Sequence, residues 1–335
     1  MSKRTVEKKP IKSKEELRRE KELNKSIIPV AKPIQKDLGI MAIQKEEDVF
    51  VKSNNEFCKI YSIKTSPLPD NNKLPFLELL CEKTTCRMRI TSFCKMNADK
   101  MNSYSFLTVF FRAGSYAEVY EQIKEFERML IMEVCKPLDI VLARCRIDNI
   151  LSFIYMNCTG KMKQFDYNEL LSRRTSLKRM PFTELNMGKD GIFECDEKYG
   201  KVYFGKGLPI KPITNNSFLK NRDVGFQIAV DIQSMTTEEQ ELYEYELQRI
   251  YNYKLKSTDK KMVSMTYMLS VLADSEEKIK MLDNEAVKDF TDNKMLILPC
   301  VGREREAFQS ACTFGLLDFK AANMVELKVA SSLLP

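Results

Sequence analysis

Two stretches of the chain share one pattern, in which an apolar run leads into a helix. Residues 107–115 read Leu-Thr-Val-Phe-Phe-Arg-Ala-Gly-Ser, and residues 268–275 read Met-Leu-Ser-Val-Leu-Ala-Asp-Ser. Each run is apolar enough for a buried strand, ends in Ala-x-Ser and precedes an acidic first helical turn. Two similar α+β halves would explain the repetition, and two unrelated strand-to-helix junctions would explain it as well.

The clearest helix starts after Ser115. Ser115 and Glu118 form a capping box, in which the hydroxyl and the carboxylate satisfy free backbone N–H groups. The apolar stripe that follows has helical spacing and consists of Val119, Ile123, Phe126 and Leu130. A second capping box, Thr236 with Glu239, predicts another helix. Strand-like segments recur along the chain at 48–64, 87–95, 105–112, 201–204, 224–233 and 262–272. We therefore predict an α+β fold of mixed or antiparallel sheets with packed helices.

The N-terminal segment differs from the rest in charge. Residues 1–30 contain ten basic and five acidic side chains, so they carry +5 of the net charge of +7. We expect a disordered basic tail, either as a solvated extension or as a contact for an anionic membrane surface; weak nucleic-acid contact is a third option. The candidate contact residues are Lys3, Arg4, Lys8, Lys9, Lys12, Lys14, Arg18, Arg19, Lys21 and Lys25.

Prolines at 29 and 33 mark a linker between this tail and the body of the chain. The predicted organisation is a flexible basic tail and linker over residues 1–35, a first α+β subdomain over 36–180 and a second over 181–335.

Composition excludes several kinds of site. The chain has no histidine, which rules out Ser-His-Asp and Cys-His catalysis and metal sites with imidazole ligands. Its ten cysteines form no C-x-x-C pair, so reduced thiols are expected rather than disulfides or zinc. No apolar run is long enough to span a bilayer, and no secretory signal is visible, so we expect a cytoplasmic protein. Because no cofactor or metal motif is recognised in the sequence, we also expect no cofactor and no metal.

One segment has the spacing of a phosphate-binding loop. Residues 200–207 match G-x4-G-K, but Gly207 stands where a Ser or Thr must hold magnesium. The apolar run Val202–Phe204 lies inside the motif, and a P-loop needs a strand before it and a helix after it. A hairpin strand is therefore the better interpretation.

The order of these segments resembles the N-terminal, non-ATPase domain of the TraC/TrsE-type conjugation ATPases of type IV secretion systems. The resemblance covers about residues 36–335. The segments that carry it are Gly39-Ile40, Val49–Lys52 through Tyr61, Leu107–Glu121, Asp196–Tyr203, Val224–Glu239, Met265–Asn284, Ala307–Gly315 and Ala330–Pro335. The chain departs from the family at Thr313, where the family has Pro. The family's Walker motifs would follow Pro335, so the resemblance carries no ATPase activity to this chain.

The resemblance implies a non-catalytic assembly or docking domain at the cytoplasmic face of a conjugation channel. Its implied partners are channel components, ATPase subunits and further copies of itself, with possible peripheral contact to anionic membrane. The alternative is a nucleic-acid-binding protein of a plasmid or mobile element that uses the basic tail. An enzyme of unrecognised type is a third possibility. Steep salt dependence of binding would indicate nucleic acid.

Overall fold

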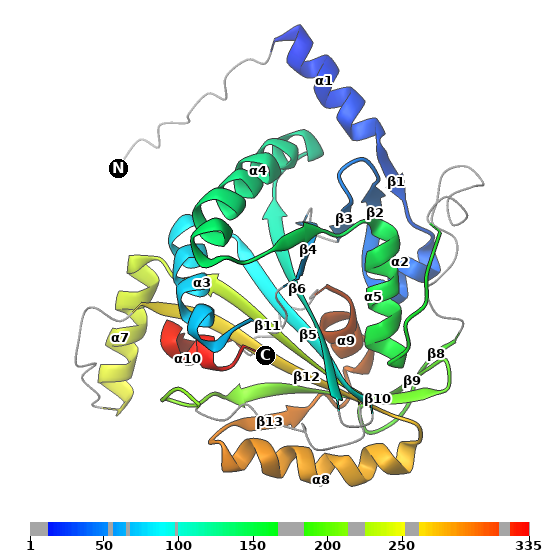
Figure 1. The fold of residues 1–335 in the computed structure, drawn as a ribbon, viewed down its shortest axis with the longest axis vertical. Helices are drawn as coiled ribbons and strands as arrows, with labels where there is room; N and C mark the ends of the chain where they lie inside the picture. Colours follow the sequence, from blue (N-terminus) through cyan, green and yellow to red (C-terminus); the bar gives the residue numbers. More distant parts are fainter. Residues whose placement is uncertain are drawn as a thin grey trace, which may run out of the picture.

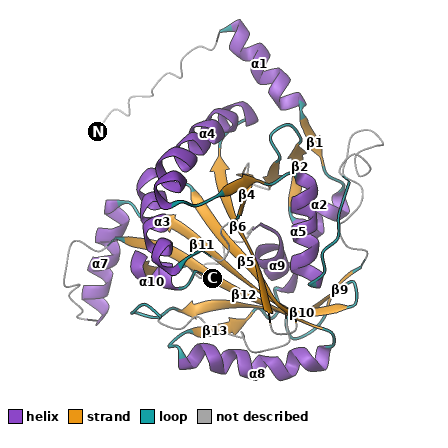
Figure 2. Cartoon of the chain, in the orientation of Figure 1, coloured by secondary structure: helices purple, strands orange, loops and turns teal. Residues whose placement is uncertain are grey.

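The computed structural model describes residues 13–52, 56–64, 68–97, 100–166, 184–213, 225–251, 261–314 and 322–334. Within these residues the chain forms one sheet of 14 strands with helices on both faces (Figures 1 and 2). All strand pairs are antiparallel. The predicted α+β class is confirmed, and of the two sheet types that were left open, the antiparallel one is correct.

Apart from the edge strand β1 (Ile27–Pro29), the sheet has the same arrangement when read from either end. The strand order is β1-β2-β3-β4-β6-β5-β11-β12-β10-β9-β8. The first half consists of β2 (Ile40–Gln44), β3 (Val49–Lys52), β4 (Glu56–Ile63), β5 (Arg87–Asn97) and β6 (Lys100–Arg112). The second consists of β8 (Leu185–Met187), β9 (Ile192–Cys195), β10 (Lys198–Gly207), β11 (Gly225–Ser234) and β12 (Met262–Ala273). The two similar halves are therefore present in the sheet order.

The strands that leave the main path repeat the same scheme. β7 (Leu142–Arg144) pairs with β4, and β13 (Leu296–Pro299) pairs with β10, so each half has one short strand beside its third strand. β14 (Asn323–Glu326) pairs with β12 in the second half alone among the described residues.

The halves meet along β5 and β11, which pair over eight residues on each strand from Met88↔Ile232 to Lys95↔Gly225. Ile90 lies opposite Val230 within this pairing. The predicted subdomain boundary at 180–181 lies outside the described residues, and the strands on its two sides belong to one sheet.

Local capping explains why the same helix follows the same strand in both halves. β6 leads into α4 (Tyr116–Met129), and β12 leads into α8 (Glu276–Asp292). Ser115 Oγ accepts a hydrogen bond from Glu118 N, and Ser275 Oγ accepts one from Lys278 N. The two serines have nearly identical backbone angles, with φ −148° at both and ψ 160° and 158°. The repeated Ala-x-Ser pattern therefore marks equivalent positions.

Two apolar cores lie on opposite faces of the sheet. One face is covered by α3 (Asp70–Lys83), α4, α8 and α10 (Leu327–Ser332). The other is covered by α2 (Lys32–Leu38), α5 (Ile147–Thr159), α9 (Glu304–Phe308) and the π-helix η4 (Gln309–Phe314). A second π-helical segment, η2 (Leu130–Cys135), continues α4, and the 3-10 turn η3 (Lys136–Leu138) follows it.

The expectation of a flexible tail over residues 1–35 is wrong for the described part of that segment. Residues 13–35 contain α1 (Lys14–Lys25), β1 (Ile27–Pro29) and the start of α2. β1 pairs with β2, and Leu23 and Ile27 pack against the core. Pro29 fits because β1 is an edge strand, where proline is tolerated. Residues 1–12 lie outside the described part.

The remaining helix, α7 (Thr237–Tyr251), begins at the predicted capping box. Thr236 Oγ1 accepts from Glu239 N at 3.2 Å, and the Glu239 carboxylate accepts from Thr236 N at 2.8 Å.

Candidate functional site

Helix α1 carries those predicted contact residues that the structure describes, and it is held against the body of the protein. Arg19 Nη2 lies 3.1 Å from Glu121 Oε1 of α4, and its guanidinium lies 5.9 Å from the centre of the Tyr120 ring. At the end of α1, Ser26 Oγ donates to Leu23 O at 2.6 Å and accepts from Gln44 Nε2 at 3.1 Å. The helix is thus fixed to both α4 and β2.

The outer face of α1 is a basic stripe formed by Lys14, Arg18, Lys21 and Lys25. Because an α-helix turns about 100° per residue, spacings of 4, 3 and 4 place these four side chains on one face. All four are exposed. Arg18 pairs with Glu22 at 3.3 Å, whereas no ion pair of Lys14, Lys21 or Lys25 occurs within the described residues.

The ten predicted contact residues therefore divide into three groups. Four form the basic stripe. Arg19 points toward α4 instead. The other five, which are Lys3, Arg4, Lys8, Lys9 and Lys12, lie outside the described residues. Contact with anionic lipid or with nucleic acid remains a prediction for all of them.

The segment with P-loop spacing is a strand. Residues 200–207 belong to β10, which pairs with β9, β12 and β13. The described residues that follow it, 208–213, are in irregular conformation and form no helix. The interpretation as a hairpin strand is confirmed, and its backbone N–H groups face neighbouring strands rather than a phosphate.

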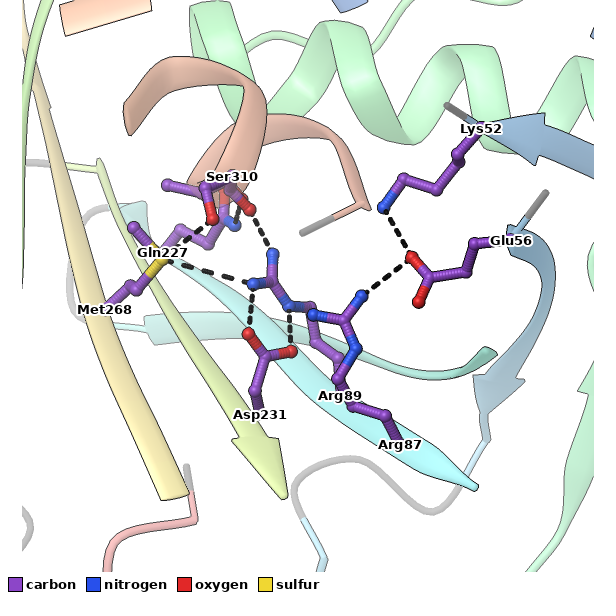
Figure 3. Close-up of polar contacts among 9 residues, drawn as sticks. Lys52, Glu56, Arg87, Arg89, Gln227, Asp231, Met268 and Ser310 are labelled. Atoms are coloured by element: carbon purple, nitrogen blue, oxygen red, sulfur yellow. Dashed lines mark hydrogen bonds and ion pairs between the residues drawn. The ribbon is translucent and has the colours of Figure 1, made fainter. Parts of the chain in front are cut away.

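A central charge cluster lies between the sheet and η4, and the sequence analysis did not find it (Figure 3). Its members are Lys52 of β3, Glu56 of β4, Arg87 and Arg89 of β5, and Asp231 of β11. Arg89 holds Asp231 with two hydrogen bonds, Nε to Oδ1 at 2.7 Å and Nη2 to Oδ2 at 2.6 Å. Burial alone would raise the pKa of Asp231, but the Arg89 guanidinium outweighs it and holds that pKa below its usual value.

The other end of the cluster centres on Glu56. Its carboxylate lies 2.9 Å from Arg87 Nη2, 3.7 Å from Lys52 Nζ and 3.3 Å from Arg112 Nε. Lys52 and Arg87 both stack on the ring of Phe110, at 4.8 Å and 4.0 Å. Burial lowers the pKa of Lys52 from 10.5 to about 8, although the nearby carboxylate favours the charged form. A lysine this deeply buried destabilises the fold while it is charged.

The cluster also fixes η4 to the sheet. Three consecutive backbone carbonyls of η4, at Ser310, Ala311 and Cys312, accept hydrogen bonds from side chains. The donors are Arg89 Nη1 of β5 for Ser310, Gln227 Nε2 of β11 for Ala311, and Asn157 Nδ2 of helix α5 for Cys312 at 3.4 Å. Buried backbone carbonyls need such partners, so these side chains determine where η4 sits.

The cysteines form no disulfide and are mostly buried. Eight of the ten cysteines are buried. Burial raises the pKa of Cys58, Cys145 and Cys300 to about 12, which suppresses the reactive thiolate. In the part of the chain that the structure describes, no group of Cys, Asp and Glu is arranged to hold a metal ion. No helix among the same residues is long and apolar enough to cross a membrane.

No protein-family model matches this chain, and no curated protein is significantly similar to it.

Proposed function

We propose that this chain is a non-catalytic assembly domain of a conjugative type IV secretion ATPase, which docks other subunits at the cytoplasmic face of the channel. The segments that resemble that family coincide with units of the fold. Val49 to Tyr61 forms the hairpin of β3 and β4, Leu107–Glu121 forms the junction of β6 and α4, and Asp196–Tyr203 forms the turn into β10. This agreement supports the proposal because the resemblance rests on the order of the segments.

The observation that carries the proposal is the division of charge between the inside and the outside of the fold. Inside, the central charge cluster is engaged with itself and with η4. Outside, exposed charges that form no ion pair within the described residues lie on the outer faces of helices, as Lys14, Lys21 and Lys25 do in the basic stripe of α1. Charged surfaces of this kind favour recognition of another macromolecule.

The test is a binding experiment with a purified P-loop ATPase domain of the TraC/TrsE type. Isothermal titration calorimetry should detect a complex with the full chain, and the chain alone should add no ATP turnover. Absence of any complex would refute the docking role. Magnesium-dependent ATP binding by the chain alone that is lost in Lys206→Ala would refute the non-catalytic role.

The nucleic-acid alternative is separated by salt. Phosphate contacts release counterions, so DNA binding through several basic residues should fall by orders of magnitude between about 50 and 200 mM salt. Tight DNA binding with such a slope, together with no ATPase complex, would favour the alternative.

A further inference from the structure

Helix α7 presents a face that is both acidic and apolar, which we call the α7 face. Glu238, Glu241, Leu242 and Tyr245 lie on one side of the helix at helical spacing. Leu242 and Tyr245 are each 61% exposed, and because they are three residues apart on the helix they form one small apolar patch. The two glutamates are exposed and form no ion pair within the described residues. The opposite side of α7 meets the body, where Tyr243 Oη donates to Met324 O at 3.5 Å.

The basic stripe of α1 is complementary to the α7 face. Its four cations extend over three helical turns, about 16 Å at 1.5 Å per residue. Leu17 is 46% exposed and neighbours Lys14 and Lys21 on the helix surface. Thus α1 presents cations around an exposed leucine, and α7 presents carboxylates beside an exposed leucine and tyrosine. The two faces are opposite in charge over the first two turns of α7, before the exposed Arg249 follows on the same side of that helix, and both faces carry exposed apolar side chains.

The two faces cannot meet within one molecule. α1 lies at the top of Figure 1 and α7 at the lower left, with α4 and α3 between them. A contact between the two faces therefore requires a second copy of the chain. Because each copy carries both faces, the contact is between different surfaces and can repeat from copy to copy.

We infer that the α7 face of one copy docks on the basic stripe of another. Charge complementarity and the exposed apolar side chains on both faces support a second copy as the occupant. An anionic lipid surface or a nucleic acid would match the basic stripe but would leave the acidic and apolar α7 face uncovered, whereas a second copy covers both. The inference goes beyond the proposed function and is tested on this chain alone, so its failure leaves the ATPase-docking experiment unaffected.

The experiment uses two charge-reversed variants of the full chain. One carries Lys14→Glu, Lys21→Glu and Lys25→Glu on α1, which leaves Arg18 as the single cation of the stripe, and the other carries Glu238→Lys and Glu241→Lys on α7. Sedimentation velocity should show concentration-dependent association of the unmodified chain that weakens at least tenfold between 50 and 300 mM salt. Each variant alone should associate at least tenfold more weakly, because the faces then carry like charges. Lys288→Glu and Glu125→Lys, which reverse exposed charges on other helices, should leave association unchanged.

The decisive sample is an equimolar mixture of the two variants. Reversed α1 is acidic and reversed α7 is basic, so the mixture should recover association that neither variant shows alone. Unchanged melting temperatures of both variants would confirm that they fold. The inference is wrong if the unmodified chain stays monomeric at 50 mM salt, or if mixing restores nothing. It is equally wrong if the α1 variant loses binding to vesicles of anionic lipid, or to duplex DNA, while its self-association is unchanged.

Discussion

Gly200 of β10 lies directly opposite Phe193 of β9, and the aromatic ring occupies the space above the glycine. A Cβ atom at position 200 would lie 2.2 Å from Phe193 Cζ, which is well inside van der Waals contact. The same ring packs edge-on against Phe308 of α9, with ring centres 5.0 Å apart. The first glycine of the P-loop-like motif therefore serves packing, because it leaves room for an aromatic side chain that links the sheet to α9.

This arrangement predicts that Gly200→Ala destabilises the protein by about 1–3 kcal/mol through overpacking. Gly207→Ala is the matched control, because a Cβ there would meet only Leu296 Cβ, at an ordinary 3.4 Å. Urea unfolding followed by circular dichroism measures both. Equal stability of the two variants would show that Phe193 can move aside.

Phe308→Ala should remove the other partner of the Phe193 ring. Phe308 is fully buried, so truncation should lower the free energy of unfolding by about 3–5 kcal/mol. This outcome would show that Phe308 anchors α9 on the sheet. Phe308→Leu, which retains most of the apolar volume, should lose less. A variant as stable as the unmodified protein would contradict the placement of α9.

The substitution Asp231→Asn should destabilise the fold, because it breaks the ion pair between Arg89 and Asp231. The buried Arg89 guanidinium then has no counter-charge, which typically costs about 3–5 kcal/mol. Because the pKa of Asp231 is lowered in the folded state, its ionised form contributes stability above the unfolded pKa near 3.8, and this is lost as pH falls through the folded pKa. The difference in unfolding free energy between the unmodified protein and Asp231→Asn should therefore have its full value at pH 7 and decrease in acid. A difference that is constant with pH would mean that Asp231 is not ionised.

Lys52→Met should stabilise the protein at neutral pH, by about 1–3 kcal/mol, because it removes a buried charge. Glu56 keeps Arg87 and Arg112 as partners in this variant. The folded pKa of Lys52, about 8, lies below the unfolded value of 10.5, so between these values the unfolded chain holds a proton that the folded chain has lost. Rising pH therefore favours the folded lysine-containing protein at this site, and the advantage of methionine should be largest below pH 8 and fade toward pH 10.5.

The comparison in that experiment must be between the two proteins at each pH. Cysteines and tyrosines also titrate above pH 8, and their effect cancels in the difference. Unfolding free energies from urea at pH 7 and pH 9.5 are sufficient. A methionine variant that is less stable at pH 7 would show that the Lys52–Glu56 ion pair outweighs the burial of the charge.

Truncation separates the two parts of the basic N-terminal segment. A chain that begins at Ser13 should keep its melting temperature, because residues 1–12 contain few apolar side chains. A chain that begins at Val30 should melt several degrees lower, since it loses the core contacts of Leu23 and Ile27 and the pairing of β1 with β2. If residues 1–12 contact anionic lipid, the first truncation should also reduce salt-sensitive binding to anionic vesicles. Equal melting temperatures for both truncations would show that α1 and β1 add nothing to the fold.

The features that the sequence predicted are local ones. The serine caps at 115 and 275 depend on residues three positions apart, so both helix starts and the repeated half could be predicted. The central charge cluster could not, because Arg89 and Asp231 are 142 residues apart in the chain and meet only when β5 and β11 pair. The folded N-terminal segment was missed for a different reason. Its high overall charge is typical of a disordered tail. The basic side chains lie on one face of α1, but this indicates a folded helix only once Leu23 is known to pack against the core.

The pairing of β5 with β11 joins the two halves as two identical subunits would be joined in a homodimer. A polypeptide that contained only the first half would leave the free side of β5 as a long open edge, which proteins rarely tolerate. Its most economical partner would be β5 of an identical polypeptide, related by a two-fold axis between the strands. Ile90 and Val230 lie opposite each other where such an axis would pass. The centre of this sheet therefore has the form of a homodimer interface contained within one chain, to which one half contributes Arg89 and the other Asp231.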